Sequence, residues 1–573
     1  MNGPDQRPAN GRVKLGALSY MPGGMFDLIG ASVFINILSL AMPLALLQVY
    51  DRILPNTAQS TLMLLVMGVA TALILEAFLR TGRAYVSGWM GARFEHLASC
   101  SAIERLLTAS INDFERQGSG VHLERFNALN QLKEFYAGQA LQVLCDLPFA
   151  VLYLAAIGYL AGELVLVPIA LIVLFTLSAL VIGFLLRRSL ATRMAADDRR
   201  FNFIIEVLGG IHTVKGLAME NQMLRRYERL QETCAAADHK VALHSSSALS
   251  VGALFSQLTL FAVVGLGSTL VIDGLLTIGG LAACTMLAGR SMQPMQRAVG
   301  IWARFQTIRL ARERLRQIFE MPVEAEPGLP QMPPLQGALT LDNVVFRYAE
   351  NAPRIIEGAS IHIEAGQTVG IAGGNASGKT TLLYLMMGAL RPEAGTVKAD
   401  GQDLRDFDPA SVRHRIAYLP QHGVLFNGTL LENITMFRPH LAADAMEVAS
   451  VLGLDQAVAQ MPMGYETKVG YGAHDSLPRG IKQRIAIARA LVDRPQVLLF
   501  DEANTAIDGP GDAILRKLLE DLNGRVTIVL ITHRPSLLKL ADRVFDLEDG
   551  RLYPRDGGDA SPESVLLDLG VTL

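Results

Sequence analysis

Hydrophobic positions in this chain follow two patterns, which change near its middle. In the first half, six long apolar segments each approach the ~20 residues that an α-helix needs to cross a bilayer. These segments lie at residues 26–49, 60–79, 137–160, 164–186, 251–272 and 276–295. In the second half the apolar runs shorten to strand length, with turn signals and a helical pattern between them, which is typical of an α/β domain. The sequence therefore predicts a six-helix membrane domain followed by an α/β domain.

The polar stretches between the apolar segments predict the orientation of the membrane domain. The loops after the second and fourth segments are long and rich in Arg and Lys, whereas those after the first, third and fifth are short. The positive-inside rule therefore places both long loops and both termini in the cytoplasm. We expect the long loops to be helical extensions, interrupted near residues 118–120 and 209–210. They either dock on a soluble domain or form an exposed scaffold.

Few polar residues interrupt the apolar segments. Asp146 and Arg290 are the main ones, and two interpretations remain open. They line a translocation path, or they lie near the cytoplasmic helix ends and extend to water. Pro43 and Pro148 are expected to kink their helices, because proline lacks the backbone N–H that continues the helix.

The domain boundaries follow from composition. Residues 321–334 contain five prolines, which stop helices and mark a boundary. We predict a cytoplasmic tail at 1–24, a transmembrane domain at 25–320, a linker at 321–336 and a nucleotide-binding domain at 337–573. The apolar segment at 26–49 is too long for the core of a signal peptide and is interpreted as a retained membrane span.

Composition supports a membrane part joined to a soluble part. The 573 residues are 50% hydrophobic and only 18% charged, with a mean hydropathy of +0.30. A net charge of −3 gives no general attraction to nucleic acid. The four cysteines, at positions 100, 145, 234 and 284, have no paired spacing, so we predict neither a disulfide framework nor a metal site from them.

The strongest chemical signal is the stretch 373–380, which matches the phosphate-binding pattern G-x-x-x-x-G-K-[ST]. An apolar run at 368–372 precedes it and a helical pattern follows, as this motif requires. Successive backbone N–H groups of the loop would surround phosphate oxygens, Lys379 would reach the β- and γ-phosphates, and Thr380 would ligate Mg²⁺. The predicted nucleotide-binding residues here are Gly373, Gly374, Asn375, Ala376, Ser377, Gly378, Lys379, Thr380 and Thr381.

Polar side chains also follow the other predicted strands. The apolar run at 497–500 ends in Asp501 and Glu502, which suit a Mg²⁺ contact and a general base that polarises the attacking water. His533 follows the run at 526–531, where the ends of parallel strands face a ligand, and we expect it to contact the γ-phosphate. Tyr348 follows the strand pattern at 339–346; it either stacks on adenine or is an ordinary edge-strand tyrosine.

These elements, in this order and spacing, resemble the nucleotide-binding domain of ABC transporters. The resemblance matches Tyr348 to the A-loop, 373–380 to Walker A, Gln421 to the Q-loop, 498–501 to Walker B and His533 to the H-loop. It also matches residues 505–508 to the D-loop. It implies ATP hydrolysis with Glu502, His533 and Gln421 as catalytic residues, and Mg²⁺ held by Thr380, Gln421 and Asp501. Six spans followed by one such domain resemble a half-transporter of the type I exporter class.

Within this family, three segments resemble the type I secretion ATPases, at residues 47–55, 145–148 and 288–294. That resemblance implies export of a protein or peptide cargo across the bacterial inner membrane. It also implies a periplasmic adaptor and an outer-membrane tunnel protein as partners. The short N-terminus is not expected to contain the peptidase domain of peptide-processing relatives.

One motif departs from the family pattern. Where the family has the signature Leu-Ser-Gly-Gly-Gln, this chain has Leu-Pro-Arg-Gly-Ile at 477–481, and Tyr471 replaces the acidic residue of the X-loop. In the family, each ATP lies between Walker A of one subunit and the signature of the other. We therefore predict a heterodimer with a second half-transporter that has an intact signature. The alternative is a homodimer in which Arg479 supplies a phosphate contact; a regulatory subunit with low turnover is a further alternative, which the presence of Glu502 disfavours.

Overall fold

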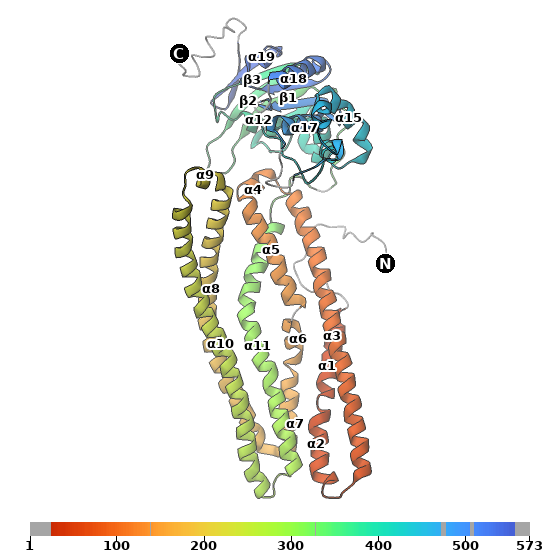
Figure 1. Ribbon diagram of the computed structural model, residues 1–573, viewed down its shortest axis with the longest axis vertical. Helices are drawn as coiled ribbons and strands as arrows, with labels where there is room; N and C mark the ends of the chain where they lie inside the picture. Colours follow the sequence, from red (N-terminus) through yellow and green to blue (C-terminus); the bar gives the residue numbers. More distant parts are fainter. Residues whose placement is uncertain (1–23, 138, 327, 471–476, 505–508, 556–573) are drawn as a thin grey trace. The chain divides into compact units, whose positions relative to one another are not determined.

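The computed structural model describes residues 24–137, 139–326, 328–470, 477–504 and 509–555 (Figure 1). The chain divides into two compact units. One comprises Met1–Leu106 and Ser119–Glu320, and the other comprises Leu107–Gly118 and Met321–Leu573. The short segment 107–118, which the sequence pattern placed in the membrane domain, thus belongs to the unit that contains the phosphate-binding motif.

The first unit is helical throughout its described residues. Long helices α8 and α10 pack along each other, and α11 packs against α2, α7 and α10 (Figure 1). The helices are α1 (Gly24–Leu38), α2 (Ala41–Gln48), η2 (Val49–Ile53), α3 (Gln59–Leu107), α5 (Gly118–Ala137), α6 (Gln139–Asp146), α7 (Phe149–Ala161), η3 (Gly162–Val165), α8 (Leu166–Gly209), α9 (Ile211–Gly216), α10 (Glu220–Ile272) and α11 (Ile278–Phe319).

Four helical stretches among the described residues are long and apolar enough to cross a membrane: Gly24–Ile53, Gln59–Leu107, Gln142–Gly209 and Glu220–Ile272. The third stretch contains two of the segments that the sequence predicted as separate spans. Large apolar side chains such as Phe78, Phe184 and Phe261 point outward and are exposed in the isolated chain, as lipid-facing residues are. The count of six spans stays a prediction.

Helix breaks occur at the residues that the sequence singled out. The first span is broken between Leu38 and Ala41, just before Pro43, and the third is broken between Asp146 and Phe149, at Pro148. The proline ring clashes with the preceding turn and supplies no N–H, so the helix ends one turn early. The pair Gly209 and Gly210 likewise ends α8 and is followed by the short helix α9.

Asp146 lies in a buried polar network. Its carboxylate is 6% exposed and accepts hydrogen bonds from Arg83 Nη1 at 2.9 Å and from Asn36 Nδ2 at 3.1 Å. Arg83 is also buried and donates to Ser32 Oγ at 3.0 Å. The alternative that Asp146 extends to water is therefore wrong: its charge is compensated by an ion pair inside the helix bundle. Arg290 is half-buried on α11.

The predicted topology can be tested with single cysteines in a background lacking the four native ones. Gly120 and Asn56 are both exposed, and a side chain at Gly120 meets only Ile205, at 4.0 Å, so cysteine fits. We expect a cysteine at 120 to resist a membrane-impermeant thiol reagent in intact cells and a cysteine at 56 to react, because the long basic loops lie inside. Permeabilised cells, where both should react, are the control. The opposite labelling pattern would contradict the topology.

The second unit contains two main sheets. The larger has the strand order β12-β11-β3-β10-β9-β6, in which all neighbours are parallel except β12. The smaller is antiparallel, with the order β2-β1-β4-β5, and a two-stranded sheet joins β7 and β8. The strands are β1 (Leu339–Phe346), β2 (Ile356–Ile363), β3 (Thr368–Ala372), β4 (Ala394–Ala399), β5 (Gln402–Asp403), β6 (Ile416–Leu419), β7 (Gly428–Thr429), β8 (Lys468–Val469), β9 (Val497–Asp501), β10 (Thr527–Ile531), β11 (Arg543–Glu548) and β12 (Arg551–Pro554).

The central strands β9 and β10 are buried along their whole length, which explains why their sequences are continuous apolar runs without alternation. The α-helices of this unit are α4 (Ile111–Glu115), α12 (Lys379–Met386), α13 (Pro409–Arg415), α14 (Leu430–Thr435), α15 (Ala442–Val451), α16 (Leu454–Val458), α17 (Arg479–Leu491), α18 (Gly509–Leu522) and α19 (Pro535–Leu538). The sequence prediction of an α/β domain is confirmed.

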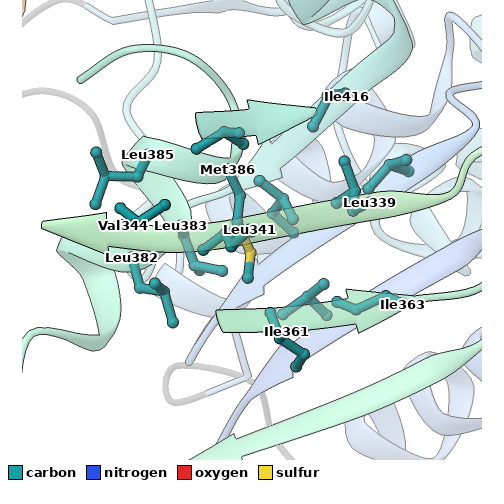
Figure 2. Close-up of a cluster of buried hydrophobic side chains, with 14 of the residues drawn as sticks. Leu339, Leu341, Val344, Ile361, Ile363, Leu382, Leu383, Leu385, Met386 and Ile416 are labelled. Atoms are coloured by element: carbon teal, nitrogen blue, oxygen red, sulfur yellow. The ribbon is translucent and has the colours of Figure 1, made fainter. Parts of the chain in front are cut away.

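One hydrophobic core joins the two sheets through α12. Figure 2 shows Leu382, Leu383 and Met386 of α12 in one cluster with Leu341 of β1, Ile361 of β2 and Ile416 at the start of β6. These three α12 side chains are fully buried. Because α12 begins at Lys379, this core fixes the helix that carries the end of the phosphate-binding motif.

Segment 107–118 completes this second unit. Ser110 N donates to Pro322 O at 3.0 Å and Glu324 N donates to Thr108 O at 2.9 Å, so the segment pairs with the residues that follow the membrane domain. Ile111 of α4 packs against the core around α12. Asn112 Nδ2 donates to Tyr348 O at 3.1 Å, directly after β1.

Candidate functional site

The predicted site residues gather at one edge of the larger sheet. Parallel strands β3, β10 and β9 lie side by side, so their carboxyl ends meet. Walker A follows β3, His533 comes shortly after β10, and Asp501 ends β9. This edge, beyond the carboxyl ends of parallel strands, is where α/β sheets bind ligands.

The phosphate-binding loop has a backbone that only particular residues tolerate. Gly378 lies in the left-handed region with φ of +98°, and a Cβ there would come within 2.7 Å of Ile355 Cγ2. Ala376 also has a positive φ, of +62°. The loop turns directly into α12, and a glycine-rich loop that leads into a helix N-terminus is suited to bind an anion.

Lys379 is held inside this loop. The residue is 8% exposed, and its Nζ donates to Gly373 O at 2.8 Å and to Gly374 O at 2.7 Å. Burial lowers the pKa of the Lys379 ammonium, and the carboxylates of Glu502 and Asp501 act in the opposite direction. The ammonium therefore lies within the electrostatic influence of both acidic residues that the sequence singled out.

Glu502 brings three predicted residues together. Its Oε1 is 2.9 Å from His533 Nε2, and its Oε2 accepts a hydrogen bond from Gln421 Nε2 at 3.0 Å. Its backbone has φ of +46° and its N–H donates to Ile531 O at 2.8 Å. A glutamate in the left-handed region carries backbone strain of a kind that gathers at functional sites. The geometry thus places Gln421 and His533 on the two oxygens of the Glu502 carboxylate.

Tyr348 is tied to the first turn of α12. Its hydroxyl lies 3.0 Å from Thr381 Oγ1, and its ring packs edge-on against Phe346, with centroids 5.0 Å apart. Tyr348 lies two residues after the end of β1. This position fits both interpretations from the sequence, adenine stacking and an edge-strand tyrosine. Thr381 is buried, and this contact joins Tyr348 to α12.

The divergent signature begins helix α17. Pro478 is its N-cap, with no side-chain cap hydrogen bond, and its carbonyl accepts from Ile481 N and Lys482 N. Arg479 is exposed at the first helical position. Further along α17, buried Gln483 accepts from Gly423 N at 3.0 Å and donates to Pro420 O at 2.9 Å, which fastens the loop around Gln421 to this helix. The predicted D-loop at 505–508 and X-loop residue Tyr471 lie outside the described residues.

One contact at this site is not indicated by the sequence. Tyr418 of β6 donates a hydrogen bond from its hydroxyl to Asp501 Oδ2 at 2.9 Å. The only sequence signal was an aromatic residue near the end of a short strand, two residues before Pro420, and nothing in the pattern indicates its partner.

The residues present suit a nucleoside triphosphate with Mg²⁺. Mg²⁺ prefers oxygen ligands, and Thr380 and Asp501 supply a hydroxyl and a carboxylate, while Gln421 supplies an amide oxygen. Ser377 Oγ is buried in the phosphate loop with no hydrogen-bond partner among the described residues. An anionic ligand would satisfy an unpaired buried hydroxyl in a loop that also holds a buried ammonium.

The fold and this site define an ABC exporter. The family ABC transporter transmembrane region matches residues 25–295, and the family ABC transporter matches residues 356–505. The chain belongs to the ABC transporter family. It has a helical membrane domain and a P-loop ATPase domain, and it hydrolyses ATP in a reaction coupled to transport.

Similar proteins narrow the class. The chain is 32% identical to the cyclolysin secretion/processing ATP-binding protein of Bordetella pertussis, over 91% of this chain and 73% of that protein. It is 31% identical to the alpha-hemolysin translocation ATP-binding protein of Escherichia coli O157:H7, over 92% of this chain and 74% of that protein. It is 32% identical to the leukotoxin translocation ATP-binding protein of Mannheimia glucosida, over 91% of this chain and 74% of that protein.

A solved structure shares the fold. It is described as a bacterial Atm1-family ABC exporter with ATP bound, and it matches with a TM-score of 0.78 at 23% identity, over 92% of this chain and 95% of that one. The sequence interpretation as an ABC exporter that resembles type I secretion ATPases is confirmed.

Proposed function

We propose that this protein is one half of a dimeric exporter that moves a protein or peptide cargo across the bacterial inner membrane, as part of a type I secretion system. Its similarity to proteins named for the secretion or translocation of cyclolysin, alpha-hemolysin and leukotoxin supports this proposal. A periplasmic adaptor and an outer-membrane tunnel protein would complete the path.

The site geometry supports specific roles in hydrolysis. Lys379 and the N–H groups of 373–381 bind the β- and γ-phosphates, while Tyr348 faces the base. Glu502 polarises the attacking water, with Gln421 and His533 holding its two oxygens at 3.0 and 2.9 Å. Mg²⁺, held by Thr380, Gln421 and Asp501, would neutralise charge on the β- and γ-phosphates.

The signature of this chain supports a heterodimer. Pro478 has no backbone N–H and no hydroxyl, so two donors to the γ-phosphate of a partner's ATP are missing. Exposed Arg479 stands where a glycine permits close backbone approach. A homodimer would have two weakened sites. A partner with an intact signature would complete one full site with this chain's Lys379, Asp501, Glu502 and His533.

The test compares the purified chain alone with the chain co-expressed with a second half-transporter. We expect cargo-stimulated, vanadate-sensitive ATPase activity from the pair and about 10²-fold less from the lone chain, because each missing donor weakens transition-state stabilisation. Restoring the serine and glycine of the family signature with Pro478→Ser and Arg479→Gly should raise the ATPase activity of the lone chain.

Arg479→Ala distinguishes the homodimer alternative, and Arg516→Ala, on the exposed part of α18, is its matched control. Robust activity of the lone chain, lost in Arg479→Ala but kept in Arg516→Ala, would contradict the heterodimer and support a phosphate contact from Arg479.

A further inference from the structure

Tyr418 is the aromatic residue of the short edge strand β6, which runs parallel to β9. In that register Tyr418 pairs with Leu499, two residues before Asp501. The phenol therefore reaches forward along the neighbouring strand, and its hydroxyl donates to Asp501 Oδ2 at 2.9 Å. Asp501 is 5% exposed, so this contact lies away from bulk water.

The direction of this hydrogen bond is fixed by chemistry. An ionised carboxylate has no proton to give, so the phenol O–H is the donor and Asp501 Oδ2 is the acceptor. A phenol has one proton to donate. Tyr418 uses it on one carboxylate oxygen of Asp501, which leaves the other oxygen as the acceptor for a further ligand.

Tyr418 is itself held by α12. Its ring packs against Tyr384 with centroids 5.3 Å apart and planes tilted by 59°. Tyr384 lies one turn after Thr380 on the helix that begins at the phosphate loop. The two tyrosines thus join β6 to β9 and α12. Asp501 on β9 and Thr380 on α12 are two of the oxygen ligands proposed for Mg²⁺.

We propose that Tyr418 is a positioning residue for Mg²⁺: it fixes the Asp501 carboxylate so that its remaining oxygen is presented to the metal alongside Thr380. This inference rests on the proposed role of Asp501. A carboxylate held by a permanent donor loses no rotational freedom when the metal arrives, so the metal binds more tightly.

The experiment uses the full-length complex carrying Tyr418→Phe, which keeps the ring against Tyr384 and removes only the hydroxyl. Mn²⁺, a paramagnetic substitute for Mg²⁺, is titrated by electron paramagnetic resonance in the presence of a non-hydrolysable ATP analogue. We expect the Mn²⁺ Kd to rise roughly tenfold, the scale for losing a hydrogen bond to a charged group. We expect analogue affinity in EDTA to stay unchanged.

Two variants complete the design. Tyr465→Phe is the matched control, because Tyr465 also donates to an aspartate, Asp455, but on the exposed surface. It should leave Mn²⁺ affinity unchanged. Replacement of Tyr418 by 4-aminophenylalanine keeps a ring donor and should restore most of the lost affinity.

Unchanged Mn²⁺ affinity in Tyr418→Phe would overturn the inference, as would an equal loss of analogue affinity in EDTA, which indicates general damage to the fold. Failure of 4-aminophenylalanine to restore affinity would overturn it too, by assigning the effect to ring packing. The variant Asp501→Asn distinguishes a failure of the role proposed for Tyr418 from a failure of the role proposed for Asp501. If it weakens Mn²⁺ binding while Tyr418→Phe does not, only the role of Tyr418 fails; if neither does, the role of Asp501 fails.

Discussion

Replacing Glu502 with glutamine is expected to lower ATP hydrolysis ~10²–10⁴-fold while ATP binding survives, since this is the usual contribution of a general base. Glutamine keeps the size of the side chain and one oxygen that accepts from Gln421 or His533. It removes the charge that would draw a proton from water. Phosphate release measures the rate, and a fluorescent ATP analogue measures binding.

The matched control is Glu520→Gln, because Glu520 lies on the surface of α18 and pairs only with Arg516 there, at 3.1 Å, among the described residues. It should hydrolyse ATP like the unmodified protein. The rate must be measured in a complex whose other subunit is catalytically inactive. A near-normal rate for Glu502→Gln in that complex would show that another group acts as the base.

Replacing Lys379 with methionine is expected to reduce ATP hydrolysis by about 10²–10³-fold, the scale for removing one preorganised electrostatic contact to the transition state. Nucleotide affinity should fall as well, because the ammonium contacts ground-state phosphates. The melting temperature should change little. Methionine removes the desolvation cost of a buried ammonium, and this gain offsets the loss of the hydrogen bonds that Lys379 donates to Gly373 O and Gly374 O.

Lys517→Met, at an exposed position of α18, serves as the control for charge removal alone. Melting of the purified complex, followed without nucleotide, separates the two effects. Loss of activity together with a large drop in melting temperature would mean that Lys379 supports the loop structure rather than the phosphates.

Much of the site could be predicted because its residues follow strands. Walker A, Asp501 and His533 each lie directly beyond an apolar run, and parallel strands end at one edge whatever their order. That rule needs no knowledge of which strands are neighbours. Glu502 comes directly after Asp501, and the resemblance to ABC transporters adds Gln421; the structure places these two within hydrogen-bond distance.

Contacts that depend on register could not be predicted in the same way. Tyr418 meets Asp501 only because β6 adds beside β9 with Tyr418 opposite Leu499, and the two residues are 83 positions apart. The apolar pattern marked residues 60–79 as a span, and the helical extension expected in the following loop is present, since α3 runs over Gln59–Leu107. Hydropathy detects the lipid-facing part of this helix and not where its polar continuation ends.

Segment 107–118 has a practical consequence for biochemistry on fragments. A soluble ATPase fragment that begins at the proline-rich stretch 321–334 lacks α4, although Ile111 covers part of that fragment's core. Such a fragment would expose this apolar spot to water and leave Tyr348 O without Asn112 as its donor. Kinetic constants measured on it would describe a protein with an altered surface around Tyr348. A fusion that joins 107–118 to the fragment through a short linker would restore the native surface.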